Sequence, residues 1–272
     1  MNIVSFGGGT NSTAMLIGMH LHNIKVDMIM FADPGGEHPH TYEYLDIFNK
    51  WLMERGMPEI EQVYAVNKDG ERMNLYQECI DRHTLPPIAF GFKSCSQKYK
   101  GAPQDKRLNN DEQCKAIWKS GSKVQKWIGY DAGETKRIQC AMAYDDKDKK
   151  FHRHFPLYEW GWDRDECKRV IARAGLPLPG KSSCFFCPSM KKKEIVRLRN
   201  DYPELFEKAK FMEVNAENLT TTKGLGRNWS WTDFMEVYDL NAEMEKAQIT
   251  LFDFIEQQQD CGCIDPCGCY DG

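Results

Sequence analysis

The stretch that decides the fold is Ser5-Phe6-Gly7-Gly8-Gly9-Thr10-Asn11-Ser12-Thr13, which follows an apolar pair and precedes apolar residues at helical spacing. Glycines permit a tight turn from strand to helix, and without a Cβ they let backbone N–H groups approach an anion at the positive end of the helix. The stretch therefore predicts a strand, a phosphate-binding loop and a helix. It matches neither the Walker A loop nor the dinucleotide G-x-G-x-x-G pattern. A tight turn capped by Asn or Ser is the plainer alternative.

Composition limits the class of protein. The chain has 272 residues, a formal net charge of −4 and eleven cysteines. The slight negative charge argues against binding long duplex nucleic acid through bulk charge, although a local basic face is compatible with it. With no apolar run long enough to span a bilayer and no signal peptide, we expect a cytoplasmic protein without a membrane partner. In that compartment eleven cysteines indicate metal or cluster ligands rather than disulfides.

Apolar runs alternate with helical patterns along most of the chain. Strands are expected at 2–6, 26–31, 60–66, 124–129 and 151–157, and helices at 11–22, 41–55, 73–83, 104–110, 112–120 and 163–174. This order predicts an α/β fold with a doubly wound, mostly parallel sheet, in which ligands bind at the carboxyl ends of the strands. We expect a nucleotide-binding domain at 1–180, a cysteine-containing helical extension at 181–255 and a cysteine-rich tail at 256–272.

The glycine loop resembles the S-G-G-x-D-S-T loop of the PP-loop ATP pyrophosphatases, in particular their phosphoadenosine phosphosulfate (PAPS) reductase-like branch. The resemblance implies a three-layer fold of the adenine nucleotide alpha hydrolase type that binds ATP or adenylyl sulfate, with Mg²⁺. It implies that Asn11 and Ser12 are catalytic. It also implies that the nucleotide is held by Ser5, Gly7, Gly8, Gly9, Thr10, Asn11, Ser12 and Thr13. Gly7 replaces the usual Ser, and Asn11 replaces an Asp whose carboxylate would bind magnesium.

Two later motifs extend the resemblance. Phe31-Ala32-Asp33, with Gly36-Glu37 and Thr41-Tyr42 after it, is similar to F-x-D-T-G-x-E-x-P-E-T-Y, which implies that Phe31 and Asp33 lie at the nucleotide. Residues 129–138 resemble G-x-R-A-D-E-S-x-R-I, which implies the same for Gly129, Glu134 and Arg137.

Charged and aromatic residues near these motifs are candidates for either the site or the scaffold. Arg137 suits a bidentate clamp on phosphate or sulfate, and the alternative is a surface arginine. We expect Lys98 to add positive charge to the catalytic site. Trp160 and Trp162 are expected to pack in the core. His38 and His40 lack a third metal ligand nearby, so we expect solvated loop histidines.

Cysteines form the second strong feature. Cys184-Phe185-Phe186-Cys187 brings two sulfurs close enough for one metal ion or cluster. Cys95 lies among Lys93, Lys98 and Lys100, which favours a thiolate there. Adenosine phosphosulfate reductases pair an upstream C-C with a downstream C-x-x-C around a 4Fe-4S cluster. The resemblance therefore implies Cys95, Cys184 and Cys187 as ligands, with one iron open because Ser94 replaces a cysteine. Zinc completed by Cys167, Cys140 or a histidine is the alternative.

Two further segments carry chemistry-bearing residues. Lys191-Lys192-Lys193, with Arg197 and Arg199, predicts either a guide for a nucleotide or nucleic-acid backbone or a solvated charged face. The tail contains Cys261-Gly262-Cys263 and Cys267-Gly268-Cys269. These pairs suit a redox-active or persulfide-accepting tail, or a second zinc clip.

These features together indicate adenine-nucleotide-dependent sulfur chemistry of the PAPS reductase-like type, with a cysteine-bound metal or cluster. One alternative is ATP-dependent thiolation or modification of a nucleic acid. The other is a non-catalytic nucleic-acid-binding protein with a structural zinc. The partners implied are an adenine nucleotide, a sulfur donor protein or thiol reductant, and a nucleic-acid substrate, and the chain is compatible with a homo-oligomer.

Overall fold

The computed structural model describes residues 1–92, 94–145, 147–216 and 222–246. The first half contains β1 (Asn2–Phe6), α1 (Thr10–Leu21), β2 (Met28–Ala32), α2 (Pro39–Met53), β3 (Ile60–Val63), α3 (Leu75–Asp81), η1 (Pro87–Phe90), α4 (Ser94–Ser96), the π-helix η2 (Gln97–Gly101), α5 (Ala102–Asn109) and α6 (Glu112–Lys119). The second half contains β4 (Val124–Ile128), α7 (Thr135–Asp145), β5 (Phe151–His154), α8 (Pro156–Glu159), α9 (Arg164–Arg173), α10 (Lys192–Asp201), α11 (Pro203–Asn215) and α12 (Trp231–Lys246).

The described residues form one five-stranded sheet in the order β3-β2-β1-β4-β5, and each neighbouring pair is parallel. The predicted doubly wound parallel sheet is therefore confirmed. The chain moves outward from β1 through β2 to β3 and then crosses to the other side of β1 to form β4. A crevice opens where the strand order reverses in this way, outside the carboxyl ends of β1 and β4.

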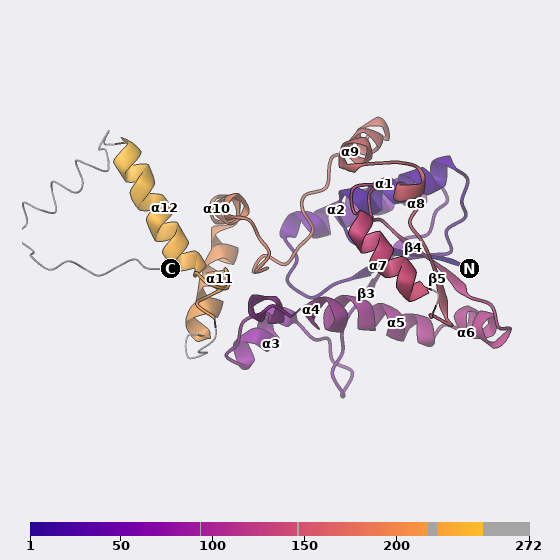
Figure 1. The fold of residues 1–272 in the computed structure, drawn as a ribbon, viewed down its shortest axis with the longest axis horizontal. Coiled ribbons are helices and arrows are strands. Elements are labelled where there is room, and N and C mark those ends of the chain that lie inside the picture. The colour runs from indigo at the N-terminus through magenta and orange to yellow at the C-terminus, as the bar shows by residue number, and fades with distance from the viewer. Residues whose placement is uncertain (93, 146, 217–221, 247–272) are drawn as a thin grey trace, which may run out of the picture.

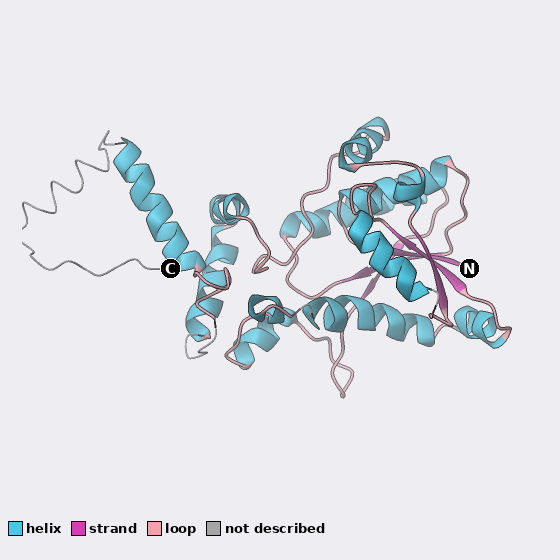
Figure 2. Ribbon diagram, in the orientation of Figure 1, coloured by secondary structure: helices cyan, strands magenta, loops and turns pink. Residues whose placement is uncertain are grey.

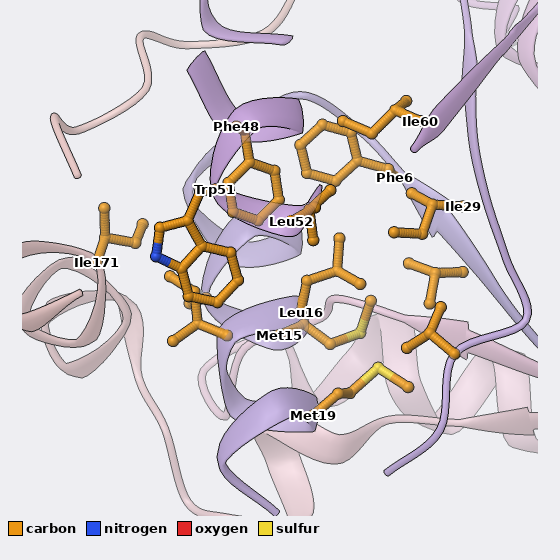
Figure 3. Packing of buried hydrophobic residues seen from close by; sticks show 14 of the residues in the cluster. Phe6, Met15, Leu16, Met19, Ile29, Phe48, Trp51, Leu52, Ile60 and Ile171 are labelled. Carbon is orange, nitrogen blue, oxygen red and sulfur yellow. The ribbon is translucent and has the colours of Figure 1, made fainter. Parts of the chain in front are cut away.

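Helices cover both faces of the sheet, which gives the three layers that the sequence predicts (Figure 1). On one face α1, α2 and α9 pack on side chains from β1 and β2, and aromatic rings from β1 and α2 stack at this interface (Figure 3). On the other face α5 and α6 cover the alternate residues of the same strands, such as Ile3 and Met30. Because successive strand residues point to opposite faces, continuous apolar runs like Met28–Ala32 are buried on both sides.

Two strands end earlier than the sequence predicts. β3 stops at Val63, and β5 stops at His154 because a short helix begins at Pro156, where the missing N–H of proline suits a first helical turn. Trp160 and Trp162 pack on the core as predicted, and Gly18 makes room for them, since a Cβ there would lie 2.3 Å from the ring of Trp160.

Helices α10, α11 and α12 form a second hydrophobic core with α3 and η1, beside the sheet rather than on its faces (Figure 2). Buried Glu213 on α11 organises this core, because its carboxylate accepts hydrogen bonds from the backbone N–H groups of Leu225 (2.7 Å) and Trp231 (2.8 Å). Burial raises the pKa of Glu213, although these hydrogen bonds act against the rise. Among the described residues, no helix has both the length and the apolar character needed to cross a bilayer.

Candidate nucleotide site and cysteine cluster

A cavity of about 750 Å³ opens at the reversal of strand order. Its walls come from the loop after β1, the loop after β4, the start of α9 and the segment that leads into α10. Of the residues predicted from sequence, it is lined by Ser5, Gly7, Gly9, Thr10, Asn11, Ser12, Gly129, Glu134 and Arg137. Segments separated by more than a hundred residues thus form one site at the position that the fold favours for ligands.

The glycine loop leaves the start of α1 open. Gly8 has a φ of +71°, and a Cβ there would lie 3.0 Å from Thr41 Cγ2, so the loop needs glycine both for its conformation and for its packing. Gly9 precedes α1 without a side-chain cap, and the first turn contains no acidic residue. Ser12 holds the loop in shape, since its Oγ accepts from Gly7 N (3.2 Å) and donates to Gly9 O (3.1 Å). The uncapped N–H groups at this helix end suit an anion.

Asn11 joins three parts of the site. Its Nδ2 donates to Asp131 Oδ2 (2.8 Å) and Glu134 Oε2 (3.2 Å), and its Oδ1 accepts from Arg164 Nη1 (2.7 Å). The opposite orientation of the amide would direct its oxygen at two carboxylates. An aspartate would add a third negative charge at this position, which explains why the chain has an amide there. The carboxylates that the glycine loop lacks are therefore supplied by the loop after β4.

Gly129 lets those carboxylates reach Asn11. A Cβ at Gly129 would lie 3.0 Å from Ser12 N and Cα, both backbone atoms, so only glycine lets the end of β4 approach α1 so closely. Arg137 forms an ion pair with Glu134 and lies over the ring of Tyr130, with its guanidinium carbon 4.3 Å from the ring centre. Tyr130 therefore supports Arg137 as an aromatic platform.

Two cations of the cavity were not predicted from sequence, Arg164 at the start of α9 and Lys181, and a third, Lys191 just before α10, comes from the basic run that the sequence indicates. They belong to segments without a nucleotide motif, and only the fold brings them to the glycine loop. Ser182 also packs there, with its Oγ 3.6 Å from the Cβ position of Gly8. The cavity wall contains four cationic side chains, including Arg137, against the carboxylates of Asp131, Glu134 and Glu194. This excess of positive charge suits a phosphorylated ligand.

Other predicted residues lie outside this cavity. Phe31 and Thr13 are buried in the core, and Gly8 lies behind the loop, against Phe31 and Thr41. Asp33 is buried at the end of β2, where it accepts hydrogen bonds from Gly35 N (2.7 Å), Tyr42 Oη (2.9 Å) and Arg72 Nη2 (2.6 Å). Asp33 therefore shapes the loop after β2 and faces a separate hollow with Arg72.

Lys98 does not join the nucleotide cavity, contrary to the sequence-based expectation. Its Nζ donates to both carboxylate oxygens of Glu78 (2.6 and 2.7 Å) on α3, which directs it away from the loops of the sheet. Lys98 lines another cavity of about 710 Å³ together with Cys95. The lysine nearest the other cysteines is Lys100, whose Nζ donates to Glu37 Oε1 (2.7 Å).

The C-x-x-C turn is fixed against the loop after β2. Glu37 and Cys184 form an antiparallel bridge, Phe185 N donates to Gly36 O (2.8 Å), and Cys187 N donates to Cys184 O (3.0 Å). Glu37 connects this turn to the nucleotide cavity, because its completely buried carboxylate accepts from Lys100 and from Ser182 Oγ (3.2 Å). Burial opposes the charge of Lys100, but Glu37 outweighs this effect and raises the pKa of Lys100.

The three predicted metal ligands lie in one neighbourhood, at the edge of the second core. Burial and the Glu37 carboxylate raise the pKa of Cys184 well above its ordinary value, with Lys100 acting in the opposite direction and Cys187 and Cys95 adding to the rise. Burial also raises the pKa of Cys187. Buried thiols of this kind stay protonated until a metal displaces their protons.

Three cysteines are the ligand type that a thiolate-bound metal requires. The ammonium group of Lys100 lies near Cys184 and Cys187 and would offset the negative charge of their thiolates. Within the described residues, however, no three His, Cys, Asp or Glu side chains are arranged to hold one metal ion. Cys167 is buried in the sheet core and Cys140 is exposed on α7. The two C-x-C pairs of the tail lie outside the described residues.

His38 differs from the expectation of a solvated loop histidine. It is 7% exposed, its ring stacks on His40 at 5.0 Å, and burial together with the charge of His40 lowers its pKa to about 4. The reason is that Ser183 O accepts a hydrogen bond from His38 N (3.2 Å), which draws the loop beneath the segment that carries the cysteines.

Comparisons with protein-family models and with curated proteins give no match for this chain. Among solved structures, the chain is similar to the U34-tRNA thiolase NcsA from Methanococcus maripaludis, determined with its 4Fe-4S cluster. The two are 16% identical with a TM-score of 0.42, over 81% of this chain and 73% of that one.

Proposed function

We propose that this protein is an ATP-dependent sulfur transferase that adenylates a nucleic-acid acceptor and then replaces the adenylated oxygen with sulfur. The observation that carries the proposal is the cavity at the reversal of strand order, where an uncapped helix start faces Arg137, Arg164, Lys181 and Lys191. One carboxylate, Glu37, joins this cavity to the cysteine turn. The proposed phosphate site and the cysteine turn are therefore adjacent.

The phosphates of ATP would lie on the backbone N–H groups of the glycine loop, with the cations around them. Mg²⁺ commonly uses one or two carboxylates together with substrate phosphates. Asp131 and Glu134, oriented by Asn11, are the carboxylates available for this purpose. The acceptor oxygen attacks the α-phosphorus and pyrophosphate leaves, while Arg137 and Arg164 stabilise the negative charge that develops.

A sulfur nucleophile then attacks the carbon that bears the adenylated oxygen, and AMP leaves with that oxygen. Cys95, Cys184 and Cys187 are the residues that would hold a 4Fe-4S cluster, with zinc as the alternative, after their side chains close on it, and the bound group would activate sulfur for the attack. Lys100 and Glu37 fix the turn that carries Cys184, where Cys184 and Cys187 are partly buried. The attacking sulfur is sulfide, released from the persulfide of a donor protein when a small thiol reduces it and is itself oxidised to a disulfide.

A specific feature favours transfer to an acceptor over reduction of adenylyl sulfate. A second cavity, of about 350 Å³, shares Gly180, Lys181 and Glu194 with the nucleotide cavity and is also lined by Ser183, next to Cys184. A reductase acting on one nucleotide has no need of a second substrate cavity. Adenylyl sulfate reduction would yield sulfite, whereas the proposed reaction yields pyrophosphate, AMP and a thiolated acceptor.

The test uses anaerobically purified full-length protein with ATP, Mg²⁺, sulfide and bulk cellular RNA or denatured DNA. AMP and pyrophosphate are expected, and their absence with every acceptor, or the release of sulfite from adenylyl sulfate, would overturn the proposal. Arg137→Ala should weaken ATP binding about tenfold through loss of a charge-assisted contact. Arg169→Ala is a matched control, because Arg169 also pairs with a glutamate three residues earlier but lies outside the cavity.

Metal analysis distinguishes the proposed sulfur transferase from a non-catalytic protein with a structural zinc. Iron and acid-labile sulfide, with a brown colour, are expected in the purified protein. Cys184→Ala should remove them, whereas Cys140→Ala, a change at an exposed cysteine, should not. One zinc per chain in a colourless and inactive protein would support the non-catalytic alternative.

A further inference from the structure

The cavity of about 350 Å³ beside the nucleotide site has one aromatic wall. His38 and His40 stack at 5.0 Å with an angle of 18° between their rings, and the ring of Tyr202 lies 6.2 Å from His38 and 6.5 Å from His40. Gly180 closes tightly on this wall, because a Cβ there would lie 2.2 Å from His40. Stacked rings beside an open cavity suit a planar heterocycle.

A polar atom in the same wall has no partner. His38 is only 7% exposed, and its Nδ1 atom is buried without a hydrogen-bond partner among the described residues. Leaving a buried polar atom unpaired destabilises a protein. Turning the His38 ring toward the cavity would bring this atom to the polar edge of a ligand and offset that cost.

The rim of the cavity is charged and lies along α10. Lys181 pairs with Glu194 (2.7 Å), and Arg197 pairs with Asp201 (3.0 Å) while remaining 82% exposed. Lys191–Lys193 lie at the start of α10, where the helix dipole is also positive. Lys192 lies over the rings of Trp229 and Phe234. Lysines destabilise a helix at that end, so the placement of Lys191 and Lys193 is better explained by an anion outside the protein than by helix stability.

Taken with the proposed function, on which this step rests, we infer that the cavity of His38, His40 and Tyr202 receives one unpaired base of a single-stranded segment of the acceptor. The base stacks on the aromatic wall and the flanking phosphates follow Lys191, Lys193 and Arg197. Ser183 lines the cavity and precedes Cys184, so a base held there lies next to the cysteine turn. The volume admits one base with its sugar but not two paired nucleosides, so a base in a duplex must leave its stack to enter.

The experiment measures oligonucleotide binding with the nucleotide site filled. Full-length protein is saturated with the ATP analogue adenosine 5′-(α,β-methylene)triphosphate and titrated into fluorescein-labelled 12-mers of single-stranded RNA, single-stranded DNA and duplex. We expect one or both single strands to bind more tightly than the duplex. A 2-aminopurine base placed in the bound segment should change its emission on stacking.

Tyr202→Ala should weaken single-strand binding about tenfold and abolish the 2-aminopurine signal, and Tyr202→Phe should retain both, because the ring is what stacks. Tyr158→Ala, at an exposed tyrosine of α8 outside the cavity, is the control. His40→Ala provides a second test at a partly exposed position. Unchanged binding of the ATP analogue by these variants shows that they are folded.

Failure of this inference differs from failure of the proposed function. If the ATP analogue binds but neither single strand does, or if Tyr202→Ala and Tyr158→Ala bind the strands equally well, the base cavity is wrong while the nucleotide site stands. If the ATP analogue itself does not bind, the proposed function fails first. Equal binding of duplex and single strands, without a 2-aminopurine signal, would also overturn the inference, since it would indicate contact with the backbone alone.

Discussion

The ion pair between Glu37 and Lys100 allows a quantitative prediction, because its two partners differ in burial. The side chain of Glu37 is 0% exposed, whereas that of Lys100 is 38% exposed. Removing one partner of a buried pair costs about 3–5 kcal/mol because the other charge is left uncompensated. Lys100→Met leaves a carboxylate with no access to water and should cost about 4 kcal/mol. Glu37→Gln leaves an ammonium that water can partly reach, so it should cost about 2–3 kcal/mol.

Urea unfolding of both single variants and of the double variant Glu37→Gln/Lys100→Met measures these costs. The double variant should be less destabilised than the sum of the two, by about 2 kcal/mol, because no unpaired charge remains. Lys25→Met is the control, since Lys25 pairs with Asp27 but is 83% exposed. Additive costs, or a larger cost for Glu37→Gln than for Lys100→Met, would refute the reasoning from burial.

Three further changes test other parts of the structure. Gly129→Ala should weaken binding of the ATP analogue about tenfold in calorimetry, because the new Cβ would push the β4 loop away from Ser12; Gly101→Ala, where φ is −70° and the nearest atom would lie 3.9 Å from the Cβ, should not. His38 has a folded-state pKa of about 4 against 6.5, so its contribution to stability is present above pH 6.5 and is lost as the pH falls through 4. Urea unfolding should show about 2 kcal/mol less stability at pH 4.5 than at pH 7 from this source, and His38→Gln should lack that part of the decrease. Glu213→Ala should lower the unfolding free energy by about 3 kcal/mol, because it leaves the buried N–H of Trp231 without an acceptor; an unchanged urea midpoint would contradict this role.

Much of the sheet and of the glycine loop could be predicted from sequence, because both depend on local patterns. Apolar runs between glycine and proline turns fix where parallel strands lie, and the motif around Gly129 fixes which loop meets the glycine loop. Gly129 and Asn11 show how far such reasoning extends. Both were predicted as site residues, but only the packing of β4 on α1 shows that one is needed for close approach and the other to bind two carboxylates.

Lys98 and Lys100 show what the sequence does not reveal. They are two residues apart in the same short stretch of sequence. Lys98 nevertheless pairs with Glu78 on α3, whereas Lys100 pairs with Glu37 after β2. The π-helix across Gln97–Gly101 sets their directions, and no local pattern signals it. Arg164, Lys181 and His38 were missed or misread for a related reason, since their roles depend on contacts between distant segments.

The separation of the second core from the sheet affects how the protein is made. On the ribosome the sheet can be completed once β5 has emerged, so the glycine loop is formed while α10 and α11 are still being synthesised. Cys95 is made early, but the turn with Cys184 reaches it only after the whole sheet has been translated. Under the proposed function, the glycine loop would therefore form before the cysteines can take up a metal, and Cys95 would wait for the last third of the chain to bring Cys184 to it.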